Sequence, residues 1–184
     1  RSGPVGSALV SGFDRTLVAS ILHSFEPAPE PEQYRRHQIK IAPQQWKSRF
    51  ERARSAGLAL PHPGALPQTL CREELFLLGA KVPAGGAEAL LRFYLAVCAW
   101  GGGTSARSTA RTFTPLLQPD ALDRISTALA APTPEAQYKA FNNHSHAKVK
   151  GLGPAFFTKL MHFAAPTPDP ASRLPLILDA RVAR

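Results

Sequence analysis

The chain has 184 residues, of which 44% are apolar, so it can bury the core of one domain and a disordered protein is excluded. Lys and Arg number 22 against 13 Asp and Glu, and the net charge of +9 favours a polyanionic partner, nucleic acid first, over a basic protein without one. The two cysteines, Cys71 and Cys98, are too few for a four-cysteine metal or iron–sulfur site. We expect both to be reduced core residues, and we expect no membrane-spanning segment.

Helical periodicity recurs along the chain, whereas strand signals are weak, so the predicted fold class is all-α. The helices are expected, in chain order, at residues 14–25, 43–57, 71–82, 86–100, 105–117, 120–130, 133–141, 144–149 and 154–164, with loops at 26–32 and 101–104. Pro43 and Gly57 bound the helix at 43–57. Thr133 is placed to cap the helix at 133–141. The helix at 86–100 is apolar nearly all round, which predicts the central helix of the core.

The predicted domain organisation is simple. Residues 1–13 are expected to be a flexible N-terminus, partly foreign to the natural protein, and residues 14–184 a single helical domain. No initiating Met is present, so we expect the natural start to be missing. The chain stops one helical turn after Asp179, so we also expect a truncated C-terminus.

The stretch KGLGPAFFTKLMHF, residues 150–163, predicts a helix-hairpin-helix at about 144–164. Glycines 151 and 153 permit a tight turn, Leu152 is expected to pack between the two helices, and backbone N–H groups at the turn would bind a DNA phosphate. Lys148 and Lys150 add charge for the same phosphate. The plainer alternative is an ordinary corner between helices that contains two glycines.

The sequence after this turn favours the helix-hairpin-helix over an ordinary corner. The loop AAPTPDP and the end LPLILDARVAR follow the second helix. Together with GPAFFTK they resemble the HhH-GPD superfamily of DNA glycosylases and, more narrowly, small bacterial proteins similar to 8-oxoguanine DNA glycosylase. The resemblance is close over residues 140–184 and only architectural over 14–140, and the front β-sheet domain of the larger 8-oxoguanine enzymes has no counterpart.

The resemblance implies two catalytic residues. Asp179 matches the family's aspartate, which stabilises the cationic sugar or orients the nucleophile; an N-cap is its structural alternative. In bifunctional members a lysine on the second hairpin helix attacks the sugar, and Lys159, among phenylalanines that favour a neutral amine, is the candidate here. Those members carry the lysine at the position of Ala155, one helical turn earlier, so we expect either a shifted active site or a structural Lys159.

Other candidates have weaker signals. Trp100, Phe156 and Phe157 are candidates for stacking on an extruded base, with a core role as the alternative. Arg107 and Arg111 share a helix face, where they either contact DNA phosphates along the backbone or are simply solvated. Thr104 or Ser105 can cap their helix. The histidines of NNHSH, at 144 and 146, lack the spacing of metal ligands, so no metal is expected. No cofactor is expected; a monovalent cation at the hairpin carbonyls is the one ion left open.

We therefore expect a monomeric DNA glycosylase that flips and excises a modified base, 8-oxoguanine favoured, from double-stranded DNA. Lyase activity through a Schiff base of Lys159 is an open addition. The resemblance implies base excision repair of DNA damage in the bacterial cytoplasm, at the nucleoid. One alternative is a glycosylase for hypermodified bases of foreign DNA, a form of phage defence; another is a non-catalytic DNA-binding hairpin module.

Overall fold

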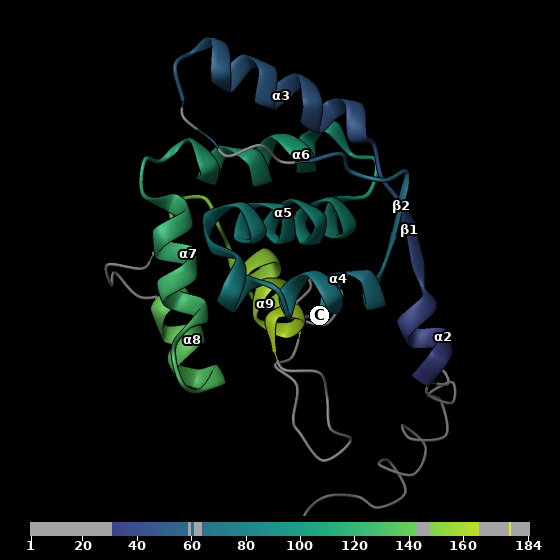
Figure 1. The fold of residues 1–184 in the computed structure, drawn as a ribbon, viewed down its shortest axis with the longest axis vertical. Helices are drawn as coiled ribbons and strands as arrows, with labels where there is room; N and C mark the ends of the chain where they lie inside the picture. Colours follow the sequence, from purple (N-terminus) through teal and green to yellow (C-terminus); the bar gives the residue numbers. More distant parts are fainter. Residues whose placement is uncertain (1–30, 59, 61–63, 143–147, 166–176, 178–184) are drawn as a thin grey trace, which may run out of the picture. The chain divides into compact units, whose positions relative to one another are not determined.

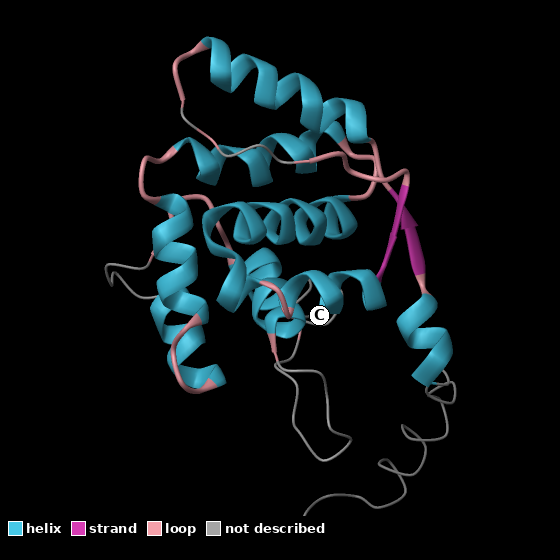
Figure 2. Cartoon of the chain, viewed as in Figure 1, coloured by secondary structure: helices cyan, strands magenta, loops and turns pink. Residues whose placement is uncertain are grey.

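Helices account for nearly all the regular structure in the computed structural model, which describes residues 31–58, 60, 64–142, 148–165 and 177 (Figures 1 and 2). The elements are α2 (Pro31–Arg36), β1 (Gln38–Lys40), α3 (Pro43–Ser55), β2 (Thr69–Cys71), α4 (Arg72–Gly79), α5 (Val82–Gly102), α6 (Ala106–Phe113), η1 (Thr114–Leu117), α7 (Ala121–Leu129), α8 (Pro134–Asn142) and α9 (Pro154–Ala164). The all-α prediction is confirmed. The described part adds two unpredicted features: the short helix α2, and an antiparallel pair, β1 with β2, in which Ile39 lies opposite Leu70.

Residues 35–184 form one compact unit and residues 1–34 another. The predicted helix at 14–25 and the predicted boundary after residue 13 lie outside the described residues and stay predictions. Within the larger unit, Figure 1 shows α3, α6 and α5 in successive layers, with α4 and α9 beneath α5 and the pair α7–α8 at one side.

The central helix is α5, as its composition predicted. Its residues from Leu90 to Trp100 are buried except Arg92, and it contacts α4, α6, α7 and α9. Gly86 has non-helical backbone angles (φ 61°, ψ −158°), so the uninterrupted helix begins where the sequence placed it. By length and composition α5 could also cross a membrane, a test that buried core helices pass as well.

Several predicted helix ends are confirmed by their caps. The Ser105 hydroxyl accepts from the N–H of Ser108 (3.2 Å), and Thr133 Oγ1 accepts from the N–H of Ala136 (3.2 Å). Pro43 opens α3, and α9 has the predicted bounds, beginning at Pro154. These are local signals, in which one side chain or ring fixes the backbone beside it.

Other predictions were wrong. Cys71 lies at the end of β2 as the N-cap residue of α4, where its N–H donates to Glu74 Oε2 (2.7 Å), and it is only half-buried; Cys98 is fully buried as expected. The helix expected at 105–117 divides into α6 and the 3₁₀ turn η1 at Thr114. The helix expected at 144–149 does not reach its predicted end, because Lys148 and Val149 are not helical, and the rest of it lies outside the described residues. The loop expected at 26–32 overlaps the start of α2.

Helix α9 is buried from Phe157 to Phe163. Its tight seat against α4 depends on Gly79, since a Cβ there would overlap the carbonyl oxygen of Phe163. The ring of Phe163 packs edge-on against Phe76 of α4 and Trp100 of α5, with centroids 5.0 and 5.5 Å away. Lys159, which lies in this buried stretch, is therefore inside the protein.

Candidate active site

A short non-helical segment, residues 148–153, leads into α9; we call it the glycine turn. Val149 and Leu152 are its buried anchors, with 2% and 6% of their surfaces exposed, so Leu152 packs inward as predicted. The N–H of Leu152 donates to the Val149 carbonyl (3.2 Å) and closes the turn. Gly151 has φ +87°, a backbone conformation that a residue with a side chain adopts only under strain.

The glycine turn leaves backbone donors available. Among the described residues, the N–H groups of Gly151 and Gly153 donate no hydrogen bond. Gly153 has an ordinary φ of −86°, and a Cβ built on it would meet nothing within 4 Å. The fold itself therefore does not require a glycine at 153, but a ligand that approaches the backbone and the N-terminus of α9 would. Such an arrangement suits a phosphate.

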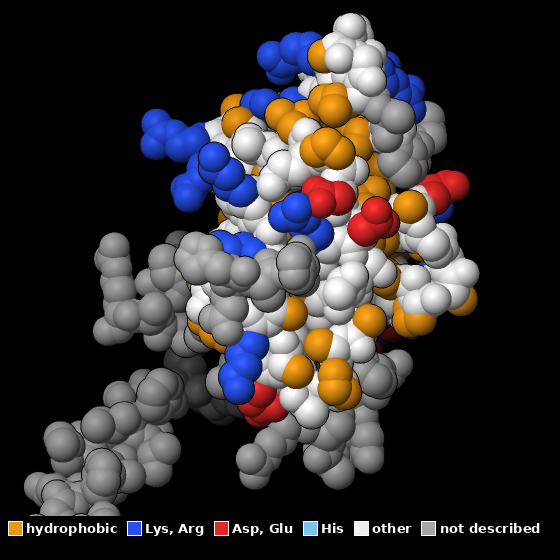
Figure 3. Space-filling view, turned by 90° about the vertical axis from the view of Figure 1, so that its left-hand side faces the viewer, with side chains coloured by type: hydrophobic (Ala, Val, Ile, Leu, Met, Phe, Trp, Pro, Cys, Tyr) orange, Lys and Arg blue, Asp and Glu red, His pale blue; other side chains and the backbone are white. Residues whose placement is uncertain are grey.

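Basic side chains lie on this turn and on α6. Lys150 is exposed and Lys148 half-buried, and Arg107 and Arg111 are exposed one turn apart on α6. Figure 3 shows Lys and Arg side chains in excess of Asp and Glu over one face of the molecule. Helix α6 continues directly into η1, and Pro115 of η1 packs against the turn: a Cβ on Gly151 would lie 3.8 Å from it. The elements with these basic side chains are therefore neighbours.

The Lys159 side chain is 4% exposed and does not snorkel to solvent. Its Nζ donates to the Ala155 carbonyl at 2.7 Å and lies 5.6 Å from the centre of the Phe156 ring. Side chains on a helix lean toward its N-terminus, so this lysine runs back along one turn of α9. The Cα of Lys159 thus lies one turn after the family's lysine position, and its amine lies beside the turn that contains Ala155; the shifted active site stays a prediction.

The end of α5 covers the lysine. A Cβ on Gly101 would lie 3.2 Å from both Cδ of Lys159 and Cε1 of Phe156, and Gly101 is itself exposed. Cys98 lies one turn earlier on α5. Burial raises the pKa of the Cys98 thiol to about 12, and a side-chain hydrogen bond from Tyr94 and the charge of Lys159 offset only part of that effect. The thiol is therefore neutral near pH 7.

The aromatic candidates divide between core and site. Phe157 is 1% exposed, stacked on Phe141 (ring centroids 5.1 Å apart, planes at 6°) and edge-on to Tyr138. It is therefore a core residue, which was the alternative to a stacking role. Phe156 is half-buried beside the lysine amine. Trp100 is 9% exposed, and its indole N–H has no hydrogen-bond partner among the described residues.

Sequence reasoning missed several residues on α9, at the end of α5 and packed against that end. His162 is 6% exposed on α9, near the rings of Phe76 and Phe163. The guanidinium of Arg72 lies over the Trp100 ring, 5.0 Å from its centre. Gly101 was interpreted only as a helix breaker. The GGG run after Trp100 was the one local signal, because consecutive glycines permit a close approach.

Asp179 lies outside the described residues, as do the histidines at 144 and 146, so their roles stay predictions. Ile177, two positions before Asp179, packs against the core. Within the described ranges no group of three His, Cys, Asp or Glu side chains could hold a metal ion.

An all-α domain with an open glycine turn, and with a buried lysine on the helix that the turn begins, belongs to the class of helical DNA glycosylases. Residues 32–184 match the model of the family described as "Putative 8-oxoguanine DNA glycosylase OGG-like protein", and the chain belongs to that family. Membership suggests DNA glycosylase activity with DNA as the substrate. No curated protein and no solved structure matches the chain.

Proposed function

We propose that this protein excises an oxidised purine, 8-oxoguanine in the first place, from double-stranded DNA and then cleaves the abasic strand through Lys159. The observation that carries the proposal is the placement of the lysine. Its amine is buried, yet it lies beside Ala155 in the first turn of α9, two residues beyond Gly153 of the glycine turn.

The proposed chemistry follows from these groups. Phosphate contacts at the glycine turn hold the strand while the damaged nucleotide is extruded. The lone pair of the Lys159 amine forms a bond to C1′ of the sugar as the glycosidic bond breaks, and the base leaves with the electron pair of the glycosidic bond and gains a proton. The Asp179 carboxylate stabilises the positive charge that develops on the sugar.

The covalent intermediate then allows strand cleavage. One proton passes from Nζ to O4′ as the C1′–O4′ bond breaks, which opens the sugar ring and leaves a protonated imine between Nζ and C1′. Loss of a proton from C2′ to water expels the 3′ phosphate by β-elimination. The exposed Gly101 over the lysine stem supports this proposal, because a position without a side chain gives a nucleotide access to the amine.

The test is excision and borohydride trapping on duplexes that each carry one modified base, with an unmodified duplex as the control. Borohydride reduces the imine to a permanent protein–DNA bond. We expect excision and trapping on 8-oxoguanine. Lys159→Gln should abolish trapping, whereas the matched variants Lys148→Gln and Lys150→Gln should retain it.

The remaining outcomes separate the alternatives. Excision without trapping would leave Asp179 with water as the nucleophile, and Asp179→Asn would then abolish all activity. Excision confined to bulky hypermodified bases would favour a role against foreign DNA. Binding without excision of any base would identify a non-catalytic DNA-binding module and refute the proposal.

A further inference from the structure

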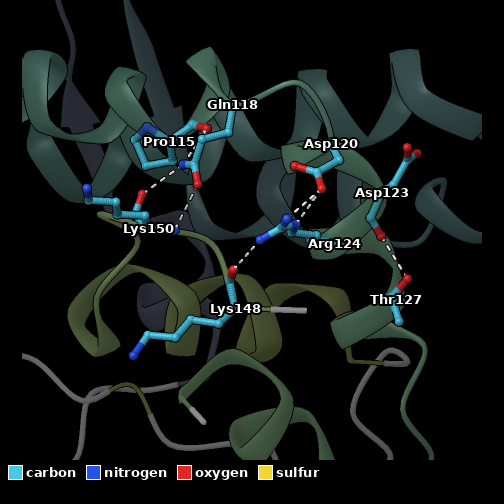
Figure 4. Close-up of polar contacts among 8 residues, drawn as sticks. All are labelled: Pro115, Gln118, Asp120, Asp123, Arg124, Thr127, Lys148 and Lys150. Atoms are coloured by element: carbon cyan, nitrogen blue, oxygen red, sulfur yellow. Dashed lines mark hydrogen bonds and ion pairs between the residues drawn. The ribbon is translucent and has the colours of Figure 1, made fainter. Parts of the chain in front are cut away.

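The amide of Gln118 holds the glycine turn from outside. Its Nε2 donates to the Lys150 carbonyl (2.9 Å) and to the Pro115 carbonyl (3.1 Å), while its Oε1 accepts from the Lys150 N–H (3.2 Å) (Figure 4). One side chain thus pairs with both backbone groups of one residue, as a neighbouring β-strand would. We call this set of bonds the Gln118 clamp.

A second anchor fixes the same segment two residues earlier. Arg124 of α7 donates from Nη1 to the Lys148 carbonyl (3.1 Å). Its guanidinium is itself held by Asp120, whose Oδ2 lies 2.7 Å from Nε and 2.6 Å from Nη2. Figure 4 shows Gln118 and Arg124 side by side along the segment. The backbone that enters the turn is therefore fixed at residues 148 and 150.

The clamp positions the turn without covering it. It binds the N–H of Lys150, but the N–H groups of Gly151 and Gly153 donate no hydrogen bond to any described part of the chain. Lys150 and Gly151, which lie between the buried anchors Val149 and Leu152, are exposed and have little of their own to hold them in place. Donors that must meet one phosphate together bind best when their backbone is already ordered.

We propose that Gln118 is a positioning residue for DNA binding, which orders the glycine turn so that its free N–H groups meet a backbone phosphate. This inference rests on the proposed function, because it needs DNA as the ligand of the turn. Lys150 is exposed, so water can replace the lost hydrogen bonds when Gln118 is changed. The fold should therefore survive the change, while the order of the turn should not.

The test compares Gln118→Met with Gln137→Met. Methionine keeps the length of the side chain and removes its hydrogen bonds. Gln137 is the matched control, because it is also half-buried and its Nε2 donates to two backbone carbonyls, those of Leu129 and Ala131, away from the glycine turn. Duplex affinity and amide hydrogen exchange across residues 148–153 are measured in both variants and in the wild type.

We expect Gln118→Met to bind duplex about tenfold more weakly, since tenfold corresponds to about 1.4 kcal/mol and ordering one residue of backbone costs about that much. Amide exchange across the turn should accelerate in this variant. Gln137→Met should change neither quantity. In a Gly151→Ala background, where the turn is already disturbed, adding Gln118→Met should cost clearly less than tenfold, because both changes act on the same contact.

Equal duplex affinity in the two methionine variants, with a wild type that binds and excises, would refute the positioning role and leave the proposed function intact. Full additivity with Gly151→Ala would also refute it, because the clamp would then act elsewhere. A wild type that binds no duplex would instead refute the proposed function, and the inference would fail with it.

Discussion

Lys159→Met should make the protein more stable and inactive at once. The lysine is 4% exposed, and burial of an ammonium costs several kcal/mol when it leaves water. Methionine retains most of the aliphatic stem and fills the same space. The variant loses the bond from Nζ to the Ala155 carbonyl, but that carbonyl still accepts the backbone N–H of residue 159 in the helix and is not left unpaired.

The expected magnitude follows from these opposing effects. A hydrogen bond from a charged donor contributes about 1.5–3 kcal/mol, against a desolvation cost of several kcal/mol. The free energy of unfolding should therefore rise by about 1–2 kcal/mol, and Tm by about 2–8 °C for a chain of this size. Such a gain on removal of a side chain is typical of residues kept for function rather than for stability.

The assay is urea and thermal unfolding at pH 7, run beside borohydride trapping on the damaged duplex. Lys139→Met, at an exposed position on α8, is the control and should change stability by no more than about 0.5 kcal/mol. A Lys159→Met variant that is less stable than the wild type by about 1 kcal/mol or more would show that the buried amine supports the fold, and the reasoning would be refuted.

Three further predictions concern binding, access and alkaline stability. Replacing Lys148 and Lys150 by Gln should flatten the plot of log affinity against log salt by about 0.9 for each lost contact, and Lys139→Gln should leave it unchanged. Gly101→Val should block excision yet preserve binding to undamaged duplex, because its side chain would fill the approach to Lys159; normal excision would exclude this route. Above pH 9 the wild type should lose stability faster than Cys98→Ala in urea titrations.

The sign of that alkaline effect follows from burial. The Cys98 thiol keeps its proton up to about pH 12 in the folded protein, against an ordinary pKa of 9.0, so the unfolded chain binds fewer protons between these values. The free energy of unfolding then falls as pH rises, by about 1 kcal/mol between pH 9 and 10. Burial also raises the pKa of Tyr94, which adds to the loss at higher pH in both proteins. Equal slopes in the two proteins would contradict a buried thiol at this position.

The helices could be predicted because their signals are local. Pro43, Thr133 and Pro154 each fix the helix end beside them, and the apolar run of α5 identified the core without any knowledge of its neighbours. The β1–β2 pair could not, because it joins three residues near position 39 to three near position 70 and neither run is long enough to show alternation. Cys71 was misassigned for the same reason, since its strand partner is distant in the sequence.

The candidate site was predictable in part. The glycines and lysines of 148–159 identified the turn and the buried amine, because those residue types carry the chemistry themselves. Gln118 carries no such signal: it lies 32 positions from Lys150, and its importance appears only when η1 is folded against the turn. Gly101 stands out in the sequence as part of a glycine run, but its proximity to Lys159 and Phe156 depends on how α5 packs on α9 and could not be predicted.

The direction of the Lys159 side chain leads to a last prediction. If catalysis depends on where the amine lies, moving the lysine to the position that bifunctional relatives use should not restore activity here. A lysine at 155 would lean back in the same way and place its amine about 5.4 Å closer to the glycine turn. Misplacement of even about 1 Å can cost a hundredfold in rate, so Lys159→Gln with Ala155→Lys should give no trapping above Lys159→Gln alone. Trapping restored by the double variant would mean that the sugar lies nearer Gly151, and that the amine seen beside Ala155 is not in its reactive position.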